Sequence, residues 1–144
     1  MTRFIAVTSG KGGVGKSNFV LNVAVSLAAM DSSVLVLDAD LGLANLDVLL
    51  GIRPQRTLED VIFQRCSLKD VVVRTDYRIG LIPGASGTQD MADLPQERIT
   101  GLLKDVSELT KDTDFILIDT ASGISTSVVS FLLASPEVVV GVVD

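Results

Sequence analysis

The apolar residues of this chain fall into short runs, which polar, glycine-containing or proline-containing segments separate. Runs of consecutive apolar residues, such as the Val-Leu-Val-Leu run of 34–37, are typical of strands that a parallel sheet buries on both faces. Apolar positions spaced three and four apart, such as Ile99, Leu102, Leu103 and Val106, indicate amphipathic helices instead. We predict strands at 4–8, 33–38, 78–82, 115–118 and 138–143, and helices at 19–30, 46–50, 95–110 and 125–134.

Two further short helices are predicted from capping signals between the second and third strands. In each case a hydroxyl residue is followed three positions later by an aspartate: Thr57 by Asp60, and Ser67 by Asp70. Such pairs satisfy backbone N–H groups that have no partner at the start of a helix. We expect each pair to open a short amphipathic helix.

Strands and helices alternate along the chain, which predicts an α/β fold with three layers and a mainly parallel sheet. Its crossovers should be right-handed, and a ligand should lie at the carboxyl ends of the strands. We interpret residues 1–144 as a single domain, since no linker or repeat divides them. No covering helix follows the predicted strand 138–143, so we expect a truncated domain that lacks the C-terminal part of the sheet.

Composition narrows the classes of function. The chain has 144 residues, a formal net charge of −6, one cysteine (Cys66) and no histidine. The charge argues against a wide nucleic-acid surface, which needs clustered Lys and Arg. The near absence of Cys and His argues against zinc and haem sites. A lone cysteine, no signal peptide and no apolar run of about 18 residues favour a cytoplasmic protein.

The strongest motif lies directly after the first predicted strand. Residues 10–17 have the spacing Gly-x-x-x-x-Gly-Lys-Ser of a phosphate-binding loop. Glycines at 10, 12, 13 and 15 let phosphate oxygens approach the backbone. Lys16 supplies a cation for the β- and γ-phosphates, and Ser17 offers a hydroxyl to Mg²⁺. A strand–loop–helix context makes a chance glycine-rich turn the weaker interpretation.

Three carboxylates complete the predicted site. Asp119 follows four apolar residues, which is the Walker B arrangement and indicates a Mg²⁺ contact, direct or through water. Asp38 and Asp40 end the second predicted strand, and strand alternation would send both to the same side, towards the metal and the γ-phosphate. The alternative for all three is a role in capping the following loops.

These residues resemble a known family. Residues 10–17 are similar to the deviant Walker A motif of the MinD/ParA ATPases, which is marked by an extra lysine, here Lys11. Residues 38–51 resemble the switch I region of that family, and residues 118–125 resemble its Walker B and switch II regions. The wording of these segments, and of 82–87, is most similar to the FlhG branch, which is also called FleN or YlxH.

The resemblance implies a chemical role for each matching residue. ATP and Mg²⁺ would be the ligands, and ATP would hold two copies of the protein together as a homodimer. Lys11 would reach the phosphates of the other subunit, Lys16 would hold the γ-phosphate, and Asp40 would position the attacking water. The implied nucleotide-binding residues are Gly10, Lys11, Gly12, Gly13, Val14, Gly15, Lys16, Ser17 and Asn18, and the implied metal-binding residues are Ser17, Asp38 and Asp119.

At the level of the cell, the resemblance implies an ATP-driven switch that controls flagellar number or placement. Its partner would be an FlhF-type GTPase or a flagellar regulator, and membrane contact would need a C-terminal segment that this chain does not contain. Two alternatives stay open: a non-catalytic nucleotide-binding or assembly module, and a ParA-type partitioning ATPase. ATP turnover would exclude the first, and the low Lys and Arg content argues against the second, so no direct nucleic-acid contact is expected.

Overall fold

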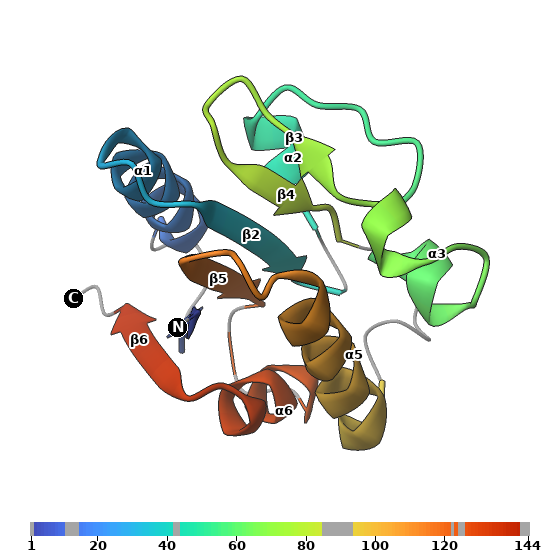
Figure 1. The fold of residues 1–144 in the computed structure, drawn as a ribbon. Coiled ribbons are helices and arrows are strands. Elements are labelled where there is room, and N and C mark those ends of the chain that lie inside the picture. Colours follow the sequence, from blue (N-terminus) through green and yellow to red (C-terminus); the bar gives the residue numbers. More distant parts are fainter. Residues whose placement is uncertain are drawn as a thin grey trace.

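The computed structural model describes residues 2–10, 15–41, 44–84, 94–121, 123 and 126–141 (Figure 1). Strands and helices alternate along most of the chain, as predicted. In chain order the elements are β1 (Arg3–Ser9), α1 (Lys16–Ala29), β2 (Val34–Ala39), α2 (Leu46–Leu49), α3 (Leu58–Ile62), the 3-10 turn η1 (Leu68–Asp70), β3 (Val73–Arg74), β4 (Gly80–Ile82), α5 (Gln96–Leu109), β5 (Phe115–Thr120), α6 (Thr126–Ala134) and β6 (Glu137–Gly141).

The described strands form one sheet in the order β3-β4-β2-β5-β1-β6. The pairings of β1 with β5 and β6, and of β2 with β4 and β5, are all parallel. The exception is β3, which pairs antiparallel with β4 and was not predicted from the sequence. It has two residues, too few to show a pattern, and its pairing with β4 is what makes it a strand. The predicted α/β class with a mainly parallel sheet is confirmed.

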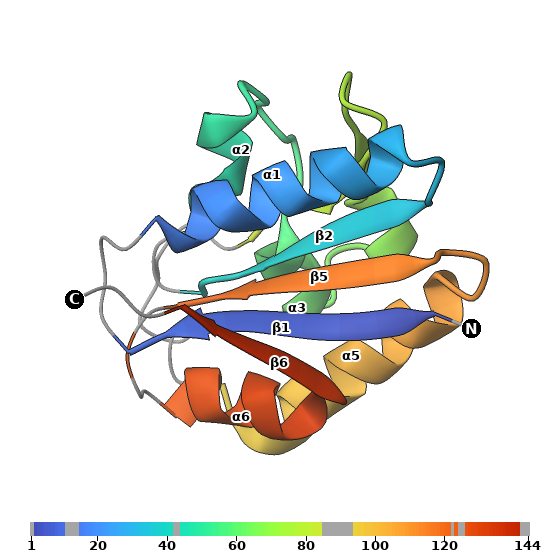
Figure 2. The same cartoon turned by 90° about the vertical axis from the view of Figure 1, so that its left-hand side faces the viewer.

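Helices cover both faces of the sheet, which gives three layers (Figure 2). Helix α1 lies on one face, and α5 and α6 lie on the other. The sheet residues alternate between the two layers, since Val34 and Val36 pack with the α1 side and Leu35 and Leu37 pack with the α5 side. Because side chains alternate along a strand, Asp38 continues the α1 side of β2.

Helix α1 begins three residues earlier than the apolar pattern predicted. Its first turn carries Lys16, Ser17 and Asn18 rather than apolar residues, so periodicity could not detect it. Gly15 precedes it with φ of 83°, in the left-handed region that glycine adopts without strain. The carboxyl ends of the parallel strands therefore meet the N-terminus of α1 at one edge of the sheet (Figure 2). No helix among the described residues is long and apolar enough to cross a membrane.

Both predicted capping pairs bind the backbone as expected. Asp60 accepts the N–H of Thr57 at 3.0 Å, and Asp70 accepts the N–H of Ser67 at 3.0 Å. The first pair opens the α-helix α3, but the second opens only the 3-10 turn η1. The expectation of a second amphipathic helix was therefore wrong, because the chain leaves the turn within three residues to reach β3.

Replacing Asp60 with alanine should lower the free energy of unfolding by about 1 kcal/mol near neutral pH, the usual effect of losing a helix cap. The pKa of Asp60 is held below its usual value, first by the N–H of Thr57 and then by Arg65, whose Nη1 lies 3.2 Å away. A lowered folded-state pKa means that the stabilisation is present above about pH 4 and is lost as the pH falls through the folded pKa. Denaturant unfolding at about pH 7 and about pH 3 checks this, and an equal difference at both would contradict it.

Candidate nucleotide-binding site

The site lies between the end of β1 and the start of α1. Ser9 ends β1 and is buried, and its carbonyl accepts the N–H of Gly123 at 2.9 Å, which ties the loop after β5 to the end of β1. Gly10 and Gly15 flank residues 11–14, so the predicted phosphate loop connects the end of a central strand to a helix N-terminus. Lys11, Gly12, Gly13 and Val14 lie outside the described residues, and the roles expected of them stay predictions.

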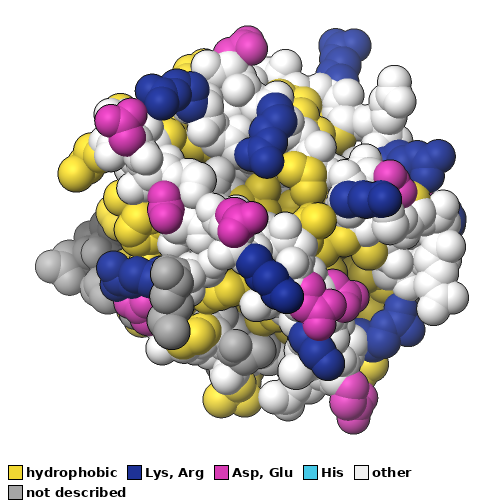
Figure 3. Space-filling view, in the orientation of Figure 1, with side chains coloured by type: hydrophobic (Ala, Val, Ile, Leu, Met, Phe, Trp, Pro, Cys, Tyr) yellow, Lys and Arg dark blue, Asp and Glu magenta, His cyan; other side chains and the backbone are white. Residues whose placement is uncertain are grey.

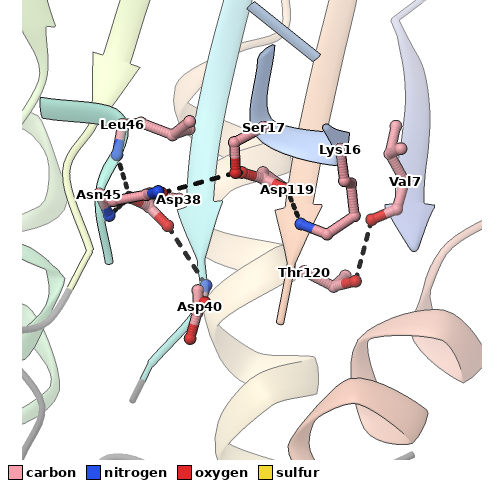
Figure 4. Close-up of polar contacts among 9 residues, drawn as sticks. All are labelled: Val7, Lys16, Ser17, Asp38, Asp40, Asn45, Leu46, Asp119 and Thr120. Atoms are coloured by element: carbon pink, nitrogen blue, oxygen red, sulfur yellow. Dashed lines mark hydrogen bonds and ion pairs between the residues drawn. The ribbon is translucent and has the colours of Figure 1, made fainter. Parts of the chain in front are cut away.

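Lys16, Ser17 and Asp119 come together at this edge of the sheet (Figure 4). The Lys16 ammonium forms an ion pair with Oδ1 of Asp119. The Ser17 hydroxyl donates to Oδ2 of the same carboxylate at 2.8 Å. The side chains of Lys16 and Asp119 are only 9% and 1% exposed, so each charge depends on the other for compensation. A cation, a hydroxyl and a carboxylate that are far apart in sequence thus form one cluster.

Asp38 lies beside Asp119, because the two residues are register partners in the parallel pair β2–β5. Its fully buried carboxylate accepts three backbone N–H groups: Asn45 and Leu46 at 3.1 Å each, and Asp40 at 3.3 Å. Burial raises the pKa of the Asp38 carboxyl to about 7, and the charge of Asp119 acts in the same direction. The loop-capping alternative therefore describes this side chain as it lies in the structure.

Asp40 is placed differently from Asp38. Strand β2 ends at Ala39, so strand alternation does not extend to Asp40, and the argument that put both carboxylates on one side fails at this residue. Asp40 is half-buried beyond the strand end, and its backbone N–H donates to Asp38 (Figure 4). Asn18 lies exposed in the first turn of α1.

Asn45 and Thr120 belong to the site, although neither was singled out from the sequence. The Ser17 hydroxyl lies 3.5 Å from Oδ1 of Asn45, whose own N–H binds Asp38. The buried Thr120 hydroxyl donates to the carbonyl of Val7 at 2.9 Å and holds the end of β5 against β1. Both residues lie in segments that resemble the family's switch regions, Asn45 in 38–51 and Thr120 in 118–125, and that resemblance was the available signal.

Known proteins are similar to this chain over nearly its whole length. A family model described as an AAA domain matches residues 2–143. The antiactivator FleN of Pseudomonas aeruginosa is 50% identical over 140 residues, which cover 97% of this chain and 50% of FleN. The flagellum site-determining protein YlxH of Helicobacter pylori is 37% identical over 139 residues, which cover 96% of this chain and 47% of YlxH.

A solved structure is similar to this chain in both sequence and fold. The septum site-determining protein MinD of Pyrococcus horikoshii, complexed with Mg-ADP, matches with a TM-score of 0.85 and 32% identity over 97% of this chain and 57% of that one. The chain belongs to the MinD/ParA family of P-loop ATPases. This confirms the predicted family, and the chain spans about half the length of the FleN and YlxH proteins that it matches.

The donor set of this MinD/ParA-family chain fits magnesium bound together with phosphates. Among the described residues, no group of three or more Asp, Glu, Cys or His side chains could hold a metal ion by itself. Magnesium usually keeps several waters and takes only one or two protein carboxylates when substrate phosphates supply further oxygens. The Ser17 hydroxyl and the Asp119 carboxylate match that smaller demand.

Proposed function

We propose that the protein is a Mg²⁺-dependent ATP-binding and ATP-hydrolysing switch. The observation that carries this proposal is the buried cluster of Lys16, Ser17 and Asp119 at the N-terminus of α1. It combines the positive end of a helix with a lysine, a hydroxyl and a carboxylate, the groups that a triphosphate and its metal need. The MinD structure with Mg-ADP supports ATP and magnesium as the ligands.

In this proposal the residues of the cluster exchange partners when nucleotide binds. Lys16 leaves Asp119 and holds the β- and γ-phosphates, because a polyphosphate carries more negative charge than a single carboxylate. Ser17 and Asp119 would hold magnesium through their side-chain oxygens, and Asp38 lies beside Asp119. Magnesium, when bound, neutralises charge on the phosphate oxygens. Asp40 orients the attacking water from the end of β2, and Lys11 reaches the phosphates of a second copy in an ATP-held homodimer.

The roles of Lys11 and Asp40 can be separated by their effect on assembly. Lys11→Ala should keep nucleotide binding by the monomer but lose the ATP-dependent dimer and turnover, because the contact across the dimer is gone. Asp40→Ala should keep the dimer and accumulate it, because hydrolysis no longer resets it. Size-exclusion chromatography with Mg-ATP, run on the natural protein and on each of the two variants made in it, is the measurement. If both run as the same species, the two assignments are wrong.

We further infer a role in flagellar number or placement, which the name of YlxH as a flagellum site-determining protein supports. A flagellar regulator or an FlhF-type GTPase is the partner expected for such a switch, and peripheral membrane contact is expected of the whole protein. The test is phosphate release from ATP by the natural protein, together with flagellar counts in cells that carry the wild type or Lys16→Ala. Turnover without any change in flagella would leave an ATPase with another task, and binding without turnover would indicate a non-catalytic module.

A further inference from the structure

The segment that follows β2 is held against the sheet by two residues for which the proposed function has no mechanistic step. This segment begins at Asp40 and includes Leu41, Ala44, Asn45 and Leu46, with residues 42 and 43 outside the described part. Leu41 and Leu46 are both buried, at 1% and 0% exposure, so the segment is anchored at both ends. Asp38 contacts it through hydrogen bonds, and Gly84, just after β4, lies close to Ala44.

The Asp38 carboxylate acts on the backbone of this segment at both ends. Oδ1 accepts the N–H of Asp40, and Oδ2 accepts the N–H groups of Asn45 and Leu46. One side chain thereby fixes the entry and the exit of the segment relative to each other (Figure 4). Hydrogen bonds from backbone N–H groups to a buried side-chain oxygen are strong at a site that excludes water.

Gly84 is buried and leaves no room for a side chain. A Cβ at this position would lie 2.7 Å from the Ala44 Cβ, 2.7 Å from the Asp38 carbonyl oxygen and 3.1 Å from Asp38 Cγ. Gly84 is not among the described glycines with positive φ, so close approach rather than an unusual backbone conformation is what requires glycine. Its neighbour Pro83 is itself fixed, since the Pro83 carbonyl accepts the N–H of Leu58 at 2.9 Å.

We propose that Asp38 and Gly84 form a clamp that positions Asp40, and that Asp38 acts through backbone hydrogen bonds rather than as a magnesium ligand. Asp38 holds the two ends of the segment together, and Gly84 sets how closely Ala44 lies against Asp38. The clamp rests on the proposed function, because its purpose is to hold Asp40 where it orients water. A displacement of about 1 Å in such a group can lower turnover about 100-fold.

The first test adds a methyl group at Gly84. Gly84→Ala should lower kcat about 10- to 100-fold, because Ala44 and Asp38 must move apart, while the Kd for Mg-ADP changes less than about threefold. Hydrogen exchange at the amides of Asn45 and Leu46 should become faster. Gly80→Ala is the matched control, since Gly80 is also a buried glycine with a close contact, but it begins β4 and its Cβ would meet the Leu35 and Arg74 side chains instead. Gly101→Ala, on α5 with nothing within 4 Å, controls for the substitution itself.

A second variant keeps the test decisive if Gly84→Ala does not fold. Ala44→Val enlarges the other side of the same contact on a half-buried residue, and it should reproduce the fall in kcat and the faster exchange. Equal kcat in Gly84→Ala, Ala44→Val and the wild type would overturn the clamp. An equal fall in Gly80→Ala would also overturn it, because the effect would then be general to β4.

Asp38→Asn separates the clamp from metal binding. Asparagine has a single acceptor oxygen, so it can accept either the N–H of Asp40 or the N–H groups of Asn45 and Leu46, but not both sets. This variant should therefore lose turnover, and exchange protection at one of the two ends of the segment, while the Mg²⁺ concentration needed for ADP binding stays within about threefold of the wild type. If the required Mg²⁺ concentration rises about tenfold or more, Asp38 is a metal ligand and the proposal is overturned. If the wild type shows no turnover, the proposed ATPase fails, and the exchange rates and Mg-ADP affinities still decide whether Asp38 and Gly84 hold the segment and whether Asp38 binds the metal.

Discussion

Lys16→Ala is expected to abolish nucleotide binding. Lys16 is the cation that the described site places at the N-terminus of α1, and no other described lysine or arginine belongs to the cluster. Removing it takes away the charge-assisted contacts that bind the β- and γ-phosphates most strongly. Titration calorimetry of the natural protein with Mg-ATP is the measurement. Lys104→Ala, on an exposed position of α5, is the matched control and should bind as the wild type does.

The same variant should lose stability without any ligand, because it removes the described cation that pairs with Asp119, whose side chain is only 1% exposed. Breaking a buried ion pair from one side typically costs about 3 kcal/mol or more. Denaturant unfolding of Lys16→Ala and Lys104→Ala would show this. ATP affinity like that of the wild type in a folded Lys16→Ala protein would contradict the assignment of the site.

Asp119→Asn is expected to weaken nucleotide binding only when magnesium is present. With magnesium, affinity should fall about 100-fold, because the carboxylate that contacts the ion is lost. Without magnesium, affinity should stay equal or increase, because Asp119 no longer competes with phosphate for Lys16. Calorimetry with ADP, in Mg²⁺ and in a chelator, measures both values.

Asp105→Asn, an exposed aspartate of α5, controls for the loss of one negative charge. A fall in affinity of the same size in both conditions would mean that Asp119 supports the fold of the site rather than the metal. An unchanged Mg²⁺ requirement would remove Asp119 from the metal site altogether.

The charged residues on the surface do not predict effects of this size. On the face shown in Figure 3, Lys and Arg side chains are interspersed with Asp and Glu side chains. Arg65, for example, pairs with Asp60 at 3.2 Å with its own side chain 61% exposed, and such surface pairs contribute little. The two predictions argued above therefore concern Lys16 and Asp119, which form a buried ion pair at the carboxyl edge of the sheet.

Several elements could be predicted because their signals are local. The apolar run of 34–37 identified a buried parallel strand, and the spacing in 95–110 identified α5 within about one residue at each end. Thr57 and Ser67 bind their aspartates as the capping pattern predicted. The elements that were missed lack a local pattern: β3 has two residues, and the first turn of α1 is polar.

The sequence by itself determined the family, the α/β class and the residue types of the site, because the spacing of residues 10–17 and the strand-end position of Asp119 are local features that the chemistry of phosphate binding constrains. Only the tertiary structure decided what these residues contact. The strand order β2-β5-β1 brings Asp38, Asp119 and Lys16 together at one edge of the sheet. Lys16 and Asp119 are more than 100 positions apart in the sequence. The role of Asp38 as a backbone acceptor, and the tight contact at Gly84, depend on how β2 and β4 pack side by side, and a motif does not contain that information.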